Sequence, residues 1–340
     1  MTVLRRLLLP WWALQLATSA KSFCDNPLIG SPRLNARGLH IARVRLAARM
    51  AAARRRRLAR FVPPDLAVAF DRDGFVLISD FLAPDAFAAL REQALAAALP
   101  AREVIQGDTV TRRIGMDSEA LAAIPMARVL LQDRRWRGLI HYVGSYASEP
   151  LTYIQSILSH RHDAPPDPQE ALHADTFHAT VKAWYFLTDV AADEGPFTYV
   201  PGSHRLTPER IAWEQGRSVR ASVGDIDRLS ARGSLRVEAA ELPGLGLPPP
   251  RAFAVPANTL IVADTHGFHA RGPSVRPSTR VEIWAYGRRN PFLPWTGFDP
   301  LGMPGIAERR IPFYWKAMNL LARWTPQPWA DVGRKRPADE

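Results

Sequence analysis

The sequence predicts a fold that is mainly β with flanking helices, of the jelly-roll type. Short apolar segments are separated by turns rich in glycine and proline, and no regular helix stands between most of them. This order is typical of antiparallel sheets packed in two layers. With 340 residues, 47% of them hydrophobic, the chain is long enough to bury one large core.

The strand segments come in a clear order along the chain. The first, 74–79, precedes a helix expected over 83–99, in which Pro84 and Asp85 suit the first turn. Residues 205–257 read as a long insertion between strands, of a length that usually covers a site or lacks order. The remaining expected strands are 151–158, 181–187, 197–200, 259–263 and 280–286.

The first 62 residues are expected to form a basic, helical arm that ends at Pro63-Pro64. Residues 1–61 hold twelve arginines and Lys21 against the single acid Asp25, a net charge of +12, while the whole chain carries +11. The basic character therefore belongs to the arm. A helix over 33–60 is expected to carry one apolar face, formed by Leu39, Ala42, Leu46, Met50 and Ala53.

Two roles for this arm remain open at this stage. A basic amphipathic segment can lie peripherally on an anionic membrane, whereas the alternative is a helix that docks on the following domain. Nucleic-acid binding is less favoured. The first twenty residues also resemble a short export signal, although Pro10 and two tryptophans suit an interfacial segment better. The single Cys24 excludes an intramolecular disulfide.

The tripeptide His173-Ala174-Asp175 is the only His-x-Asp in the sequence. His269 follows about a hundred residues later, and Arg280 lies eleven positions beyond it. Two imidazoles and one carboxylate can hold one Fe(II) on a single face and leave the opposite positions open. Alone the tripeptide would be a weak signal, but other motifs accompany it.

Several motifs around this tripeptide, in order and spacing, resemble the phytanoyl-CoA dioxygenase family of iron- and 2-oxoglutarate-dependent oxygenases. The resemblance covers roughly residues 63 to 292, and residues 71–82 look like the first strand and helix of that family. The motifs are Leu172-His173-Ala174-Asp175, Trp184-Tyr185-Phe186-Leu187-Thr188-Asp189, Glu194-Gly195-Pro196-Phe197, Val200-Pro201-Gly202-Ser203-His204 and Gly267-Phe268-His269-Ala270-Arg271-Gly272-Pro273.

The resemblance implies a cupin-like double-stranded β-helix over 63–292, followed by an aromatic and basic tail over 293–340. His173, Asp175 and His269 would be the catalytic metal ligands, with His266 as the competing third ligand. Arg280 would pair with the far carboxylate of 2-oxoglutarate, a role that suits a guanidinium fork. The further candidates near this cosubstrate are Ser274, Trp184, Gln155 and Tyr153.

These assignments predict an enzyme that uses Fe(II), 2-oxoglutarate and O2 to hydroxylate an organic substrate, releasing succinate and CO2. Such an enzyme fits the cytoplasm, with or without a peripheral membrane contact. The basic arm and the tail, from Trp315 to Trp329, favour a small-molecule or lipid-like substrate. The alternatives are a metal-binding cupin without 2-oxoglutarate chemistry and a membrane-binding protein with a relict oxygenase domain. The charged residues His160 to Asp163 are a solvated loop or an anion site.

Overall fold

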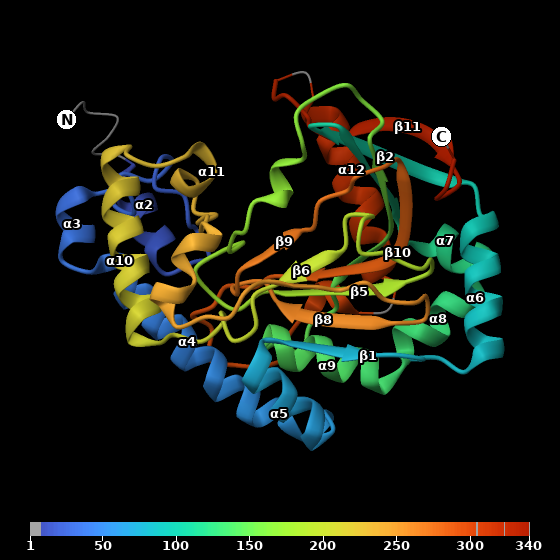
Figure 1. The fold of residues 1–340 in the computed structure, drawn as a ribbon, viewed down its shortest axis with the longest axis horizontal. Coiled ribbons are helices and arrows are strands. Elements are labelled where there is room, and N and C mark those ends of the chain that lie inside the picture. Colours follow the sequence, from blue (N-terminus) through green and yellow to red (C-terminus); the bar gives the residue numbers. More distant parts are fainter. Residues whose placement is uncertain (1–7, 304, 323, 340) are drawn as a thin grey trace.

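The computed structural model describes residues 8–303, 305–322 and 324–339, and it confirms the expected sheet core with flanking helices (Figure 1). An eight-stranded antiparallel sheet has the order β1-β8-β5-β10-β4-β3-β2-β11, and a second sheet has the order β7-β6-β9. The strands are β1 (Phe75–Ile78), β2 (Leu99–Gln106), β3 (Thr109–Gly115), β4 (Leu151–Ser159), β5 (Val181–Phe186), β6 (Phe197–Tyr199), β7 (Arg251–Ala252), β8 (Leu260–Asp264), β9 (His269–Arg271), β10 (Ser278–Gly287) and β11 (Ala330–Lys335).

Alternation along the strands gives the large sheet two different faces, because successive side chains of a strand point to opposite sides. On β5, Ala183 and Tyr185 pack into the cluster shared with the helices. Trp184 instead joins the aromatic cluster between the two sheets, stacked on Phe197 of β6 with ring centroids 4.0 Å apart. The inner face of the large sheet is therefore the face that can form a cavity.

Helices cover the outer face of the large sheet. Leu90 of α6, Leu130 of α8 and Trp136 of α9 are buried there against the strands, and α9 lies beneath β8 and β1 in Figure 1. The helices are α2 (Leu9–Leu16), α3 (Pro32–Ala36), α4 (Leu39–Leu58), α5 (Pro64–Asp73), α6 (Pro84–Ala96), α7 (Ser118–Ala123), α8 (Pro125–Gln132), α9 (Arg134–Gly144), α10 (Pro208–Val223), α11 (Arg228–Ala231) and α12 (Arg310–Leu321).

The six strands expected from the sequence are all present, within two residues at each end, and the expected helix over 83–99 is α6, which ends three residues earlier than expected. The strands β2, β3, β9 and β11 and the helices α7, α8 and α9 were not expected. The segment 205–257 contains the 16-residue helix α10, capped at Thr207, whose side chain accepts a hydrogen bond from the backbone of Arg210. It packs against α3 and α4 of the arm, as Figure 1 shows.

The N-terminal arm is helical as predicted, but its buried face is not the predicted one. Gly38, with a φ of 86°, separates α3 from α4, a left-handed conformation that suits glycine. Leu46 of the expected apolar face is 49% exposed, whereas Ile41 and Val44 are buried. Two arginines, Arg43 and Arg54, are also buried on this side of α4. The prediction of the apolar face was therefore wrong.

The buried arginines bind backbone carbonyl groups of the rest of the protein. Arg54 donates to the carbonyls of Pro291 at 2.9 Å, Leu293 at 2.8 Å and Ser145 at 3.1 Å. Its guanidinium carbon also lies 4.1 Å from the ring centroid of Tyr146. The neighbouring Arg55 pairs with the buried carboxylate of Asp264 at 2.8 Å. Part of the positive charge of the arm thus serves to dock it on the sheet domain.

The tail also joins the core, since β11 pairs with β2 in the large sheet. The expected division at residues 62 and 292 stays a prediction, because all three regions pack together. Of the export-like segment, residues 1–7 lie outside the described residues, while Leu9, Trp11 and Leu14 of α2 are exposed. None of the helices in the described part of the chain combines the length and apolar character needed to cross a membrane.

The docking role of the arm can be tested with Arg54→Met and, as a matched control, the exposed Arg56→Met. Loss of Arg54 leaves buried carbonyls without a donor, which should lower the free energy of unfolding by about 3 kcal/mol. Arg56→Met should change it by less than about 0.5 kcal/mol. Urea denaturation of the full chain measures both, and equal stability of the two variants would contradict the docking role.

Candidate metal centre

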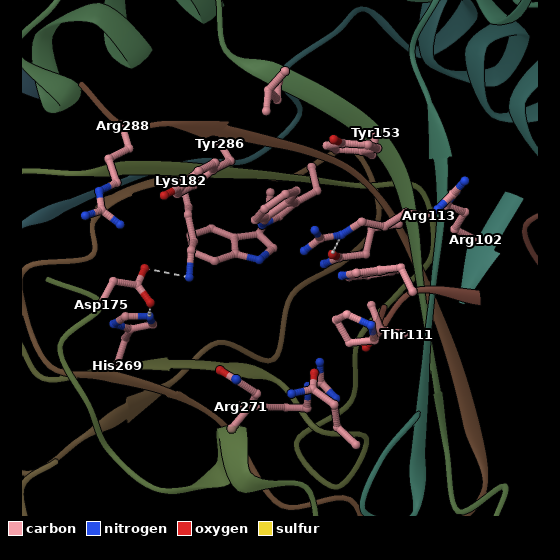
Figure 2. A pocket seen from close by; sticks show the side chains of 18 of the residues that line it. Arg102, Thr111, Arg113, Tyr153, Asp175, Lys182, His269, Arg271, Tyr286 and Arg288 are labelled. Carbon is pink, nitrogen blue, oxygen red and sulfur yellow. Dashed lines mark hydrogen bonds and ion pairs between the residues drawn. The ribbon is translucent and has the colours of Figure 1, made fainter. Parts of the chain in front are cut away.

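A cavity of about 580 Å³ opens on the inner face of the large sheet. Its walls come from distant parts of the chain, including Lys21 of the arm, Trp184 of β5 and Trp329 of the tail. Figure 2 shows that Asp175 and His269 lie at one side of this space and Arg113 and Arg102 at the other. The cationic side chains in the wall are Lys21, Arg102, Arg113, Lys182, Arg271, Arg280 and Arg288.

Backbone pairing brings His173 and His269 together. The backbone N–H of each donates to the carbonyl of the other at 3.0 Å, which forms an isolated antiparallel bridge. Residues that exchange both hydrogen bonds stand directly opposite, so their side chains project to the same side. The two ring centroids are 4.5 Å apart.

Both imidazoles are held in the orientation that a metal ligand needs. Nδ1 of His173 donates to the carbonyl of Ala171 at 2.8 Å, and Nδ1 of His269 donates to that of Gly267 at 3.0 Å. A proton fixed on Nδ1 leaves the lone pair on Nε2. The Nε2 atom of His269 is buried and has no hydrogen-bond partner among the described residues.

Asp175 completes this group, because residues two apart in an extended segment point the same way. Its Oδ1 atom lies 3.8 Å from Nε2 of His173 and 3.7 Å from Nε2 of His269. Its Oδ2 atom pairs with Nζ of Lys182 at 2.7 Å. One ligand atom from each of the three residues falls within 4.8 Å of the others, so the set fits a single metal ion.

The electrostatic setting keeps these groups in their ligand forms. Burial lowers the pKa of His173 to about 3 and the pKa of His269 to about 4. Burial alone would raise the pKa of Asp175, but Lys182 and the two imidazoles outweigh it and hold this pKa below its usual range. The centre therefore offers two neutral imidazoles and one carboxylate near neutral pH.

A row of polar side chains runs from β3 to β10 on the inner face of the large sheet. In register, Arg113 of β3 stands opposite Gln155 of β4, which stands opposite Glu282 of β10. Arg113 Nε donates to Gln155 Oε1 at 2.9 Å, and Gln155 Nε2 donates to Glu282 Oε1 at 2.8 Å. The row ends at Arg280, whose Nε lies 2.9 Å from Glu282 Oε2.

Comparison with protein families gives a match to phytanoyl-CoA dioxygenase (PhyH) over residues 70–220. Residues 70–220 match this domain family. The match includes His173 and Asp175 but ends before His269, which the structure brings beside them, and before Arg280, which lines the same cavity. The resemblance noted in the motifs is thereby confirmed.

The solved structures that match this chain have low sequence identity to it and low TM-scores. The epimerase SnoN, in complex with Fe3+, alpha ketoglutarate and nogalamycin RO, has a TM-score of 0.42 and 21% identity over 70% of this chain and 92% of its own. HygX from Streptomyces hygroscopicus, with nickel and 2-oxoglutarate, has a TM-score of 0.44 and 17% identity over 66% and 87%. Likenesses at this level do not bear on the chemistry of this chain. No curated protein matches the sequence.

Gly267 and the PGSH turn hold the distal histidine in place. At Gly267 an added Cβ would lie 1.8 Å from the hydroxyl of Tyr199, so only glycine allows this close passage. The Oγ atom of Ser203, in the PGSH turn, accepts a hydrogen bond from the backbone of Phe268 at 2.8 Å. The turn therefore positions the residue before His269.

The remaining predicted residues divide into two groups. Trp184, Gln155 and Tyr153 line the cavity together with Arg280. Ser274 is not among the described residues that line it, and its hydroxyl donates to the carbonyl of Arg276 at 3.0 Å. Its cosubstrate role stays a prediction without support from its position.

The competing histidine lies apart from the metal group. His266 is buried and donates from Nδ1 to the carbonyl of Thr176 at 3.0 Å. It belongs neither to the candidate metal group nor to the cavity wall within the described chain. This position favours His269 as the distal ligand.

The sequence reasoning missed two lysines at the centre. Lys182, which binds Asp175, is two residues before Trp184 on the same face of β5, so strand alternation could have pointed to it. Lys21 donates from Nζ to the backbone carbonyl of Asp175. No local sequence pattern predicts that contact, because it joins the arm to a segment about 150 residues away.

The low pKa of both histidines predicts metal binding that resists acid. Between about pH 7.5 and about pH 5.5 the affinity for Co(II) should stay nearly constant. With two imidazoles of ordinary pKa, this affinity would fall about 100-fold over the same range. The Co(II) affinity stays constant because the pKa of each imidazole is lowered, so the rings take up protons only well below pH 5.5. Equilibrium dialysis at the two pH values provides the measurement, and a loss near 100-fold would contradict it.

Proposed function

We propose that this protein is an Fe(II)- and 2-oxoglutarate-dependent dioxygenase that hydroxylates an organic substrate and releases succinate and CO2. The observation that carries the proposal is the group His173, Asp175 and His269, with both Nε2 atoms and one carboxylate oxygen turned to a common point. The match of residues 70–220 to the phytanoyl-CoA dioxygenase domain family supports the same reaction class.

The ligand types fit iron. Two imidazoles and one carboxylate on one face are the protein ligands of non-haem Fe(II) oxygenases, and they leave positions for other ligands. Bound Fe(II) would supply the O2 chemistry that couples decarboxylation of 2-oxoglutarate to oxidation of the substrate. Lys182 occupies Oδ2 of Asp175, which leaves Oδ1 as the single carboxylate ligand. Because this carboxylate is present, we propose hydroxylation and not halogenation.

Arg280 is the proposed partner of the far carboxylate of 2-oxoglutarate. It is buried in the cavity wall, and its Nε atom forms an ion pair at 2.9 Å with Oε2 of Glu282, whose side chain is 0% exposed. Its Nη1 atom donates to the carbonyl of Gly195. This hydrogen bond and the ion pair with Glu282 orient the guanidinium, so Nη2 can meet a carboxylate with little further ordering.

The walls of the cavity indicate an organic substrate with an apolar part. Trp184, Trp284 and Tyr153 stand directly opposite one another on β5, β10 and β4, and Trp315 and Trp329 of the tail close the space. Aromatic rings exclude water and orient a bound molecule with little loss of entropy. A lipid-like substrate fits these walls, as does another small organic molecule.

A peripheral membrane contact has support from the exposed Leu9, Trp11 and Leu14 of α2. The internal contacts of Arg43, Arg54 and Arg55 weigh against it, since these charges face the protein. Of the two roles weighed for the arm, docking is the one we propose. A cytoplasm that supplies Fe(II) and 2-oxoglutarate suits the reaction.

Succinate release separates this function from its alternatives. Purified full-length protein with Fe(II), ascorbate and 2-oxoglutarate should form succinate, more so with its substrate. A metal-binding cupin without 2-oxoglutarate chemistry, or a membrane-binding protein with a relict domain, would form none. Comparing the metabolites and lipids of cells with and without the protein, for a shift of one oxygen atom, would identify the substrate.

Alanine substitution of the proposed ligands should separate the two candidate distal histidines. His173→Ala, Asp175→Ala and His269→Ala should each abolish Fe(II)-dependent succinate release, because the metal loses one of three ligands. His266→Ala should keep part of the activity and its iron content. Iron retained in His269→Ala and lost in His266→Ala would show that the distal ligand is His266.

Arg280→Ala should weaken 2-oxoglutarate binding by about 2 to 5 kcal/mol, because a buried charged pair is lost. Iron affinity should change little, since Arg280 is not a proposed ligand. Anaerobic titration of the Fe(II) protein with 2-oxoglutarate, followed by its visible charge-transfer band, measures the first effect. An unchanged affinity would refute this role for Arg280.

A further inference from the structure

We propose that Arg113 binds an oxyanion of the primary substrate, a carboxylate or a group of similar shape, at the side of the cavity remote from the metal ligands. The inference rests on the proposed function for the reaction, and it adds the chemical class of the substrate. It is carried by the surroundings of the Arg113 guanidinium, which are aromatic on its faces and contain no acid in direct contact.

Aromatic rings hold this guanidinium in place. Its central carbon lies 4.1 Å from the ring centroid of Trp284, 4.6 Å from that of Trp329 and 5.4 Å from that of Tyr153. These rings come from β10, the tail and β4, and the Arg113 side chain lines the cavity between them. Stacked arginine loses little further entropy when it binds a planar anion.

Arg113 has no acidic partner among the described residues that contact it. Its Nε atom donates to Gln155 Oε1, a neutral acceptor, at 2.9 Å. The nearest acid of the row, Glu282, already has one oxygen bound by Gln155 and the other beside Arg280. The amide therefore separates Arg113 from the only carboxylate in the row.

Two other arginines of the cavity have an acid partner, since Arg271 pairs with Asp167 and Arg280 pairs with Glu282. Arg102 instead donates to the carbonyl of Trp315 and to Asn319, and the exposed Arg288 donates to the carbonyl of Ser19. Burial lowers the pKa of Arg113 to about 10, so it is still charged at neutral pH. Arg113 is half-buried in the cavity wall, and a partly buried cation without an acid partner is costly unless a ligand supplies the anion.

The charge of the whole cavity points to the same class of ligand. Within the described parts of the chain, seven cationic side chains and a single acid, Asp175, line it, and only two of the seven, Arg271 and Arg280, pair with acids outside the lining, Asp167 and Glu282. Metal and 2-oxoglutarate, with charges of opposite sign, would leave this excess nearly unchanged. An anionic substrate would reduce the excess and be drawn toward the site.

Position separates this anion site from the one proposed for 2-oxoglutarate. Arg113 stands on β3, two strands away from β10, and the side chains of Gln155 and Glu282 intervene between it and Arg280. In Figure 2, Arg113 faces Asp175 and His269 across the cavity. A substrate anchored at Arg113 would extend its apolar part past the tryptophans toward the metal ligands.

A matched pair of probes tests the proposal, namely 4-phenylbutyrate and its neutral amide, 4-phenylbutanamide. Full-length protein loaded with Fe(II) and 2-oxoglutarate under anaerobic conditions is titrated with each by calorimetry. Wild-type protein should bind the carboxylate at least about tenfold more tightly than the amide. Arg113→Gln should remove this preference, and Arg113→Lys should keep part of it.

Arg288→Gln is the control, because it removes one positive charge from an exposed residue of the same cavity wall. It should leave the preference for the carboxylate within about threefold of the wild-type value, since a distant exposed charge is screened. Equal affinity of wild-type protein for both probes, including no binding of either, overturns the proposal. So does an unchanged preference in a folded Arg113→Gln variant.

The same titrations distinguish this proposal from the proposed function. The charge-transfer band with 2-oxoglutarate should appear in Arg113→Gln as in wild-type protein, because Arg280 is intact. Loss of that band in Arg113→Gln alone would place Arg113 in the cosubstrate site and overturn the inference. Absence of the band in wild-type protein would instead refute the function, while the probe preference of the metal-free protein would still test Arg113.

Discussion

The mutual backbone hydrogen bonds between His173 and His269 are the constraint on which the centre depends. They set two imidazoles opposite each other before any metal is bound, so the ligands need little reorganisation. Much of the surrounding structure maintains this pairing. The tight passage at Gly267 and the hydroxyl of Ser203 hold one side of the bridge, and Lys21 and Lys182 hold Asp175 beside it.

Backbone pairing in the large sheet likewise orders the side chains of the cavity wall. Its inner face carries polar and aromatic rows in register, with Arg113, Gln155 and Glu282 in one row and Tyr153, Trp284 and Trp184 in a neighbouring row. Because paired residues on adjacent strands share a face, a single register error would turn both rows away from the cavity. The polar row fixes Arg280, and the aromatic row fixes the shape of the space beside it.

The sequence was most informative where a motif carries the chemistry. The spacing and the neighbouring motifs predicted the metal ligands His173, Asp175 and His269, and the structure brings these residues together. Strands with strong apolar runs were also predictable. The strands β2 and β3 were not, since their charged residues, such as Arg102 and Arg113, hide the alternation.

The N-terminal arm shows a second reason why a prediction from the sequence was wrong. Predicting a helix face from apolar periodicity assumes that charged side chains turn to water. In α4, Arg43 and Arg54 turn inward because backbone carbonyl groups of remote segments lie there and accept their hydrogen bonds. Neither those carbonyls nor the contact of Lys21 with Asp175 can be seen in a local pattern. Both depend on which distant segments the fold brings together.

The placement of Lys21 and Trp329 in one cavity wall has a consequence for synthesis of the protein on the ribosome. All three candidate metal ligands have been translated by residue 269, whereas the part of the wall formed by Trp315 and Trp329 is missing until these residues emerge. A nascent chain can thus pair its histidines while the space beside them is still open to water. The strand β11, which pairs with β2 at the edge of the sheet, is the last of the strands to be translated.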